Sequence, residues 1–153
     1  HDRATIGGLS AIHQFVHIGT MAMVGGDSGL NQDAPPYMIT SGPVPAVVFG
    51  LNAIGLQRNG VPASTRQHLK TAFRYLYRSQ LTMREAVEQI KTTLPLEPEI
   101  AELLKFIATS RRGLSGGSQQ RHAGSGAGSV SVTAGEASTQ DSQSEPAARV
   151  VVS

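Results

Sequence analysis

The chain has 153 residues, 39% of them hydrophobic and 16% charged, which suits one compact domain or two small ones. The formal net charge of +2 comes without a clustered basic stripe, so we expect no nucleic-acid binding. The absence of cysteine excludes disulfides and thiolate metal sites and fits a cytoplasmic protein, and no apolar run reaches the roughly 18 residues of a membrane span.

The N-terminal part repeats every six residues between positions 6 and 34. An aliphatic residue opens each unit: Ile6, Ile12, Ile18, Val24 and Leu30. The period fits neither a helix nor a single strand, and hexads that stay in register predict a parallel β-helix of short strands and turns. We expect the aliphatic side chains to point inward. Glycines directly after them, such as Gly7 and Gly25, are expected to supply the positive φ of tight turns.

The number of hexads is small for a stable β-helix. A left-handed coil takes three hexads, and about three stacked units are needed to bury a continuous core. We therefore expect Ile6 and Ile12 to be exposed at an open end, and further coils to lie upstream of His1. An unusually short repeat that is stabilised as a trimer is the alternative.

The composition divides the chain into three parts. Residues 1–42 form the last coils, with Met38 to Thr40 as one more short strand after the proline pair Pro35-Pro36. Residues 43–114 form a small domain of three to four helices, which opens with an irregular apolar connection over 43–51. Residues 115–153 are rich in Gly, Ser, Ala and Gln, which predicts a disordered tail.

Capping residues and periodicity locate the helices. We expect a short helix over 52–60 and longer ones over about 64–79, 82–92 and 97–111. Asn52 and Ser64 are the expected N-caps of the first two, and Thr82 with Glu85 forms a capping box for the third. Basic side chains on the second and third helices form either a solvated face or a surface for an acidic partner: Lys70, Arg74, Arg78, Arg84 and Lys91.

A few side chains are candidates for binding. His13 occupies a position after the inward aliphatic where Gly or Asn is usual, so it faces a ligand or is a structural histidine. Arg58 either holds a phosphate through charged hydrogen bonds or is a surface residue. The Gly25-Gly26 pair lacks the Lys-Ser/Thr of a phosphate loop and is interpreted as turn glycines. No His or carboxylate pair has metal-ligand spacing, so no metal is expected.

Four segments together resemble one family, and the likeness covers residues 4–114. The segments are Ile6-Gly-Gly-Leu-Ser-Ala-Ile-His-Gln-Phe, Met23-Val-Gly-Gly-Asp-Ser, Gln32-Asp-Ala-Pro-Pro-Tyr and Gly50-Leu-Asn-Ala-Ile-Gly-Leu-Gln-Arg-Asn-Gly. They are similar to the acyl-carrier-protein–UDP-N-acetylglucosamine O-acyltransferases of lipid A synthesis. The resemblance extends to Tyr77-Arg78-Ser79 and Arg111-Arg112-Gly113-Leu114.

The resemblance implies a fold and a reaction. It implies the end of a left-handed β-helix followed by a helical domain, assembled as a homotrimer with sites between subunits. A 3-hydroxyacyl group would pass from acyl carrier protein to the 3-hydroxyl of UDP-N-acetylglucosamine. A His general base held by an acidic neighbour and a backbone amide at the oxyanion would serve the reaction, without a cofactor or metal.

The resemblance also assigns individual residues. His13 and Gln14 match a motif that borders the substrate cleft, Asn52 and Arg58 match residues near the nucleotide, and Gly26 matches the position that measures the acyl chain. A glycine there would leave room for a longer chain.

The chain also departs from the family pattern. The family's His-Asp segment with the general base would lie upstream, so no catalytic residue is assigned and the isolated chain is expected to be inactive. Ile54 and Asn59 replace an acidic and a basic residue of the family's nucleotide site. Two alternatives remain open: a non-catalytic trimeric module for binding or assembly, and a hexapeptide acyltransferase for another sugar nucleotide.

Overall fold

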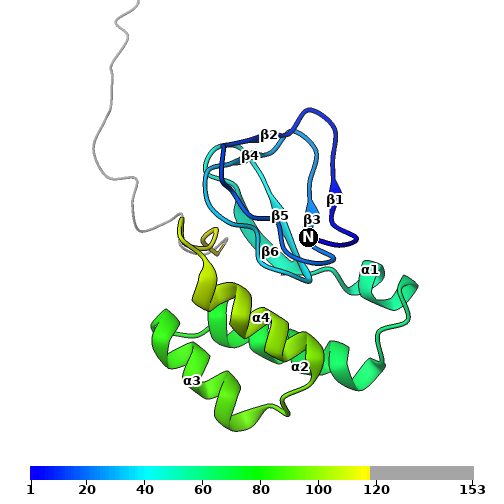
Figure 1. The fold of residues 1–153 in the computed structure, drawn as a ribbon, viewed down its shortest axis with the longest axis vertical. Coiled ribbons are helices and arrows are strands. Elements are labelled where there is room, and N and C mark those ends of the chain that lie inside the picture. Colours follow the sequence, from blue (N-terminus) through cyan, green and yellow to red (C-terminus); the bar gives the residue numbers. More distant parts are fainter. Residues whose placement is uncertain (118–153) are drawn as a thin grey trace, which may run out of the picture.

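The computed structural model describes residues 1–117 and places short strands in a coil on one side and helices beneath it (Figure 1). The strands are β1 (Thr5–Ile6), β2 (Ala11–Ile12), β3 (Met23–Val24), β4 (Gly29–Leu30), β5 (Met38–Ser41) and β6 (Val47–Leu51). The helices are α1 (Ala53–Arg58), α2 (Ala63–Tyr77), α3 (Met83–Thr93) and α4 (Pro98–Thr109). Strands thus precede helices, as predicted.

The coil is built from parallel pairs on three sides. Thr5 of β1 pairs with Met23 of β3, and Ala11 of β2 pairs with Gly29 of β4, so each partner lies eighteen positions, or three hexads, further on. A parallel bridge between Ile18 and Ala34 closes the third side. The first turn of the chain around the coil therefore takes three hexads, as the sequence period predicts, whereas Ile18 and Ala34 lie sixteen positions apart.

The inward aliphatic residues differ in burial along the coil. Val24 and Leu30 are fully buried and pack with Ala34 and Ala46. By contrast, Ile6 is 51% exposed and Ile12 is 37% exposed, which confirms the open face expected at the first hexads. An apolar side chain gains burial here only when another layer lies over it.

The glycines of the repeat have a different role from the predicted one. Positive φ values of 50° to 64° fall two residues later in the first four hexads, on Leu9, Phe15, Met21 and Asp27, so the prediction for Gly7 and Gly25 was wrong. A Cβ on Gly7 would lie 2.3 Å from the backbone nitrogen of Gly26, one coil away. The repeat needs glycine there because two backbones approach each other closely.

The segment after the coil contains a strand that the sequence did not predict. Strand β5 agrees with the predicted strand near Met38. The predicted irregular connection over 43–51 is correct only for residues 43–46, because β6 runs antiparallel to β5 with Met38 opposite Leu51. Pro43 and Pro45, which cannot donate a backbone hydrogen bond, both precede β6, so every residue of β6 retains its backbone N–H.

The helix boundaries follow their caps. Asn52 caps α1 through its side chain, and Thr82 with Glu85 forms the predicted capping box of α3. The Ser64 cap was wrong, because α2 begins at Ala63 after Pro62, whose ring fixes a suitable φ. Helices α2 and α4 also end two residues before the predicted limits, at Tyr77 and Thr109.

One hydrophobic core joins the helices to the end of the coil. Helix residues Leu69, Ile90 and Ile100 are fully buried in it together with Met38 of β5 and Val48 of β6. Since both structural parts contribute side chains, the helices are held in a fixed position against the last coil.

Residues 110–117 return from α4 to the coil, and we call them the strap. Leu114 forms a parallel bridge with Asp33, and Gly117 forms one with Val48. Ser115, Gly116 and Gly117 therefore have defined contacts, although they fall in the predicted tail; residues 118–153 lie outside the described part. None of the helices in residues 1–117 is long and apolar enough to cross a membrane.

Candidate functional site

Asn52 and Arg58, at the two ends of α1, line one cavity of about 590 Å³. Its wall consists of residues from the strands and from α1: Thr5, Met23, Ile39, Leu51, Asn52, Ala53, Ile54, Gly55 and Arg58. The structure thus brings together two of the five predicted site residues where β6 passes into α1.

The side chain of Asn52 is held rigidly between the coil and α1. Its Oδ1 accepts from the backbone N–H of Gly55 at 3.1 Å, and its Nδ2 donates to the carbonyl of Met21 at 3.0 Å. The backbone N–H of Asn52 donates to the carbonyl oxygen of Tyr37 at 2.8 Å. Since an amide nitrogen carries two hydrogens, one Nδ2 hydrogen remains available for a ligand.

Arg58 brings the positive charge to this cavity. The side chain is exposed and makes no hydrogen bond or ion pair with any other residue of 1–117. Apolar groups of Met23 and Ile39 face it from the coil, and Ile54 is 66% exposed at the rim. A cavity with one guanidinium, one amide and an apolar wall suits an anionic ligand that also has an apolar or planar part.

Asn59 does not contribute to the cavity lining. Its Nδ2 donates to the carbonyl of Gly55 at 2.8 Å, which ties the side chain to the last turn of α1. Asn59 stands where the family has a second basic residue, so among residues 1–117 Arg58 is the one cationic side chain on the wall of this cavity.

His13 and Gln14 lie elsewhere, at an exposed corner of the coil. The Nδ1 atom of His13 lies 3.0 Å from the carbonyl oxygen of Gln14 and 2.9 Å from Nη2 of Arg112 in the strap. Gly26 is also exposed on the coil, where an added Cβ would lie 3.3 Å from the carbonyl oxygen of Gly8. None of these three predicted residues lines the cavity of Asn52 and Arg58.

Sequence reasoning missed several residues of the cavity. Thr5 and Met23 line it, and each directly precedes an inward aliphatic residue of the repeat. Residues on either side of an inward position point outward in a strand, so the hexad register contained the signal for both. Ile39 could be predicted as a lining residue only from the pairing of β5 with β3, and the six-residue period does not give that pairing.

A polar contact between α4 and the coil fixes the helices next to the site. Glu102 of α4 accepts from the hydroxyls of Tyr37, at 2.5 Å, and Thr20. Burial raises the pKa of Tyr37 well above its ordinary value, and the hydrogen bond to Glu102 and the charges of Glu102 and Glu99 raise it further. The phenol therefore stays protonated and remains a donor.

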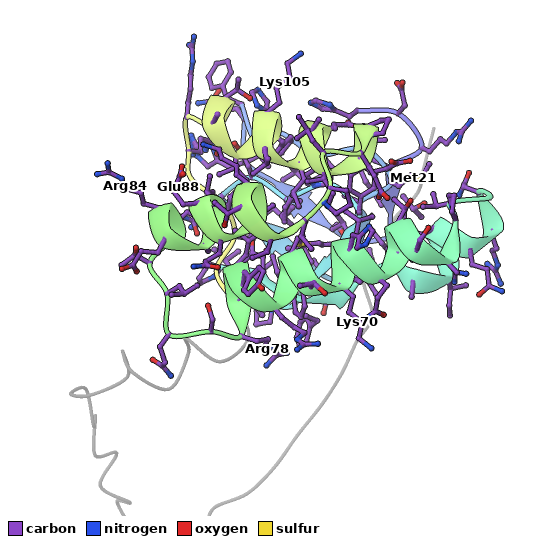
Figure 2. The ribbon with its side chains drawn as sticks, turned by 90° about the horizontal axis from the view of Figure 1, so that it is seen from below. Met21, Lys70, Arg78, Arg84, Glu88 and Lys105 are labelled. Carbon is purple, nitrogen blue, oxygen red and sulfur yellow. The ribbon has the colours of Figure 1, made fainter. Side chains whose placement is uncertain are left out.

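The basic side chains do not gather on a single edge. Lys70 and Arg78 lie along α2, whereas Arg84 projects from the start of α3 (Figure 2). The guanidinium of Arg78 donates to the carbonyl of Phe49 at 3.3 Å and lies 5.6 Å from the ring centre of Phe73. Lys91 is paired with Glu88 at 2.9 Å, so part of this surface is already neutralised.

Comparison with known proteins decides the family. A family model described as UDP N-acetylglucosamine O-acyltransferase, domain 2, matches residues 33–115, more than half of the chain. The chain belongs to this family. The match includes both cavity residues on α1, the helices and most of the strap, and it confirms the resemblance seen in the sequence.

Named relatives and solved structures extend the match into the coil. An acyl-[acyl-carrier-protein]–UDP-N-acetylglucosamine O-acyltransferase of Myxococcus xanthus is 38% identical over 113 residues, which are 74% of this chain and 43% of the relative. LpxA of Acinetobacter baumannii superposes with a TM-score of 0.70 at 39% identity, over 74% of this chain and 44% of that one. A UDP-N-acetylglucosamine acyltransferase of Bacteroides fragilis gives 0.69 at 33% identity, over 72% and 43%. The chain thus spans less than half the length of these relatives.

Proposed function

We propose that the protein transfers a 3-hydroxyacyl group from acyl carrier protein to the 3-hydroxyl of UDP-N-acetylglucosamine, the first step of lipid A synthesis. The names of its relatives support the reaction, and the cavity of Asn52 and Arg58 is the observation that carries it. The guanidinium of Arg58, which has no partner within residues 1–117, suits the diphosphate of a nucleotide, and the apolar wall suits its planar base.

Each predicted site residue has a place in this proposal. Arg58 binds a phosphate oxygen of the sugar nucleotide, and Asn52 donates its free Nδ2 hydrogen to the same ligand. His13 and Gln14 border the remainder of the substrate, and Gly26 leaves space for the acyl chain. The general base is a histidine with an acidic neighbour, encoded upstream of His1, so the 153-residue chain alone shows no turnover. No cofactor takes part.

The assembly is part of the same proposal. The parallel coils form the end of a left-handed β-helix, supported by the pairing of residues eighteen positions apart. Residues 1–42 belong to that coil and 43–114 to the helical domain, from which the strap continues to Gly117. The subunits form homotrimers in the cytoplasm, and the basic side chains of α2 and α3 receive the acidic acyl carrier protein.

Arg58→Met tests the proposal in the protein encoded by the complete reading frame. We expect UDP-N-acetylglucosamine binding, measured by calorimetry, to weaken by about 1.5–3 kcal/mol, because a charged hydrogen bond is lost. Arg84→Met on α3 removes the same charge away from the cavity and should leave the dissociation constant unchanged. Equal affinity of the Arg58→Met variant and the unaltered protein would rule out the nucleotide site.

The apolar rim of the cavity favours one second candidate, transfer to another sugar nucleotide. Ile54 is exposed at the cavity, and its side chain has no hydrogen-bond acceptor. A ligand group next to it therefore cannot donate a hydrogen bond to this side chain. Purified protein that acylates an amino-sugar nucleotide at nitrogen, but not UDP-N-acetylglucosamine at oxygen, would favour this candidate. A complete reading frame without an upstream hexad run containing His-Asp would instead favour the non-catalytic module.

A further inference from the structure

Two groups with opposite requirements converge on one nitrogen of His13. Nη2 of Arg112 lies 2.9 Å from Nδ1 of the imidazole, and the carbonyl oxygen of Gln14 lies 3.0 Å from the same atom. A guanidinium can only donate, so its contact requires a lone pair on Nδ1. A carbonyl can only accept, so its contact requires a hydrogen on Nδ1.

Only one of these requirements can be met in a neutral ring. If Arg112 donates to Nδ1, the single imidazole hydrogen lies on Nε2. If Gln14 accepts from Nδ1, the hydrogen lies there and Nε2 becomes an acceptor. The contact with arginine is charge-assisted and outweighs a hydrogen bond between neutral groups.

Arg112 is anchored in the position that this contact needs. Its Nε donates to the carbonyl of Asn31 at 3.1 Å, in the coil layer that stacks on His13. The adjacent backbone is fixed as well, because the carbonyl of Gly113 accepts from the N–H of Asp33 at 2.9 Å. The strap therefore carries a fixed donor to a corner of the coil that is 99 positions away in sequence.

We propose that Arg112 is a positioning residue that holds neutral His13 as the Nε2–H tautomer, so that the ring presents a hydrogen-bond donor to an oxygen of the bound substrate. Nε2 makes no hydrogen bond within residues 1–117, and the ring is exposed, so this donor is free. The inference rests on the proposed function for the identity of the ligand, whereas the tautomer is a property of the chain itself.

Nitrogen-15 NMR of the imidazole tests the tautomer directly in the protein encoded by the complete reading frame. At a pH where His13 is neutral, we expect Nδ1 to show the shift of an unprotonated nitrogen and Nε2 that of a protonated one. Arg112→Met should move the hydrogen to Nδ1, toward the Gln14 carbonyl, and Arg112→Lys should restore the original pattern. Arg111→Met, the exposed neighbour, should change nothing. An unchanged His13 pattern in Arg112→Met would overturn the inference.

Substrate binding tests the role of the donor in the protein encoded by the complete reading frame. With the 3-O-(3-hydroxyacyl) product of UDP-N-acetylglucosamine as the probe, we expect Arg112→Met to raise the dissociation constant about fivefold to tenfold, and Arg112→Lys to recover most of it. If Arg58→Met weakens binding but Arg112→Met does not, the donor role falls while the proposed function stands. If neither variant weakens binding, both proposals fall.

Discussion

The carboxylate of Asp33 accepts a hydrogen bond from the hydroxyl of Ser110 over 2.6 Å, although 77 positions separate the two residues. The other carboxylate oxygen accepts from the backbone N–H of His17 at 2.8 Å. Asp33 is only 1% exposed, so hydrogen bonds from these two donors replace the hydrogen bonds that its carboxylate would form with water. A buried acid thus joins two layers of the coil to the strap.

Asp33→Asn should destabilise the protein by about 1.5–3 kcal/mol, because the substitution replaces a charged acceptor by an amide that cannot satisfy both donors equally. Denaturant unfolding measures the loss. Asp27→Asn is the matched control, since Asp27 is exposed and asparagine tolerates its positive φ of 54°. Equal losses in the two variants would contradict a special role for the buried acid.

Two adjacent glycines should differ sharply in how much stability they lose on substitution by alanine. A Cβ on Gly7 would lie 2.3 Å from a backbone nitrogen, whereas a Cβ on Gly8 would meet no atom within 4 Å. We expect Gly7→Ala to cost at least about 2 kcal/mol, and Gly8→Ala to stay within about 0.5 kcal/mol of the unaltered chain. Thermal unfolding compares them, and similar midpoints would refute the close approach of the coils.

Alkaline pH should destabilise the fold through its buried tyrosines. Burial raises the pKa of Tyr77 as well as that of Tyr37, where Glu102 adds to the effect. A folded-state pKa above the unfolded one means that stability is complete below about pH 10 and falls as the pH rises beyond it. Unfolding midpoints across this range should decline less steeply in Tyr37→Phe.

Tyr75→Phe is the control for this measurement, because the hydroxyl of this partly buried tyrosine forms no hydrogen bond within residues 1–117. A slope that changes as much in Tyr75→Phe as in Tyr37→Phe would show that the buried phenol is not responsible.

Gly26 should set the acyl-chain length if it borders the acyl cleft. Filling the space with Gly26→Met should shift the preference toward shorter 3-hydroxyacyl groups by at least about tenfold, because a pocket discriminates through lost volume. Competition between carrier proteins with long and short chains measures the ratio. Gly50→Met in β6, where a side chain meets open space, should leave the ratio unchanged. A shift in both variants would reject the cleft at Gly26.

The local features of this fold were readable from the sequence. The six-residue period predicted the parallel coil and its exposed first layer, and Thr82 with Glu85 predicted the start of α3. These features depend on neighbouring residues, where side-chain spacing and capping act directly.

The features that were missed depend on contacts distant in sequence. β6 forms because β5 offers it an unpaired edge, and Gly7 is constrained by a backbone one coil away. The site divides in the same way: Asn52 and Arg58 lie six positions apart at the two ends of α1 and line one cavity, whereas the contact of Arg112 with His13 has no local signal.

The strap has a consequence for the order in which the protein is made. Synthesis proceeds from the N-terminus, so the ribosome produces Asp33 long before its partners in the strap, the hydroxyl of Ser110 and the backbones of Gly113 and Ser115. Until then the last coil keeps a carboxylate and an edge without their final partners. Nascent chains that end before residue 110 should therefore hold this coil loosely, and the coil closes only when translation of the described part is nearly complete.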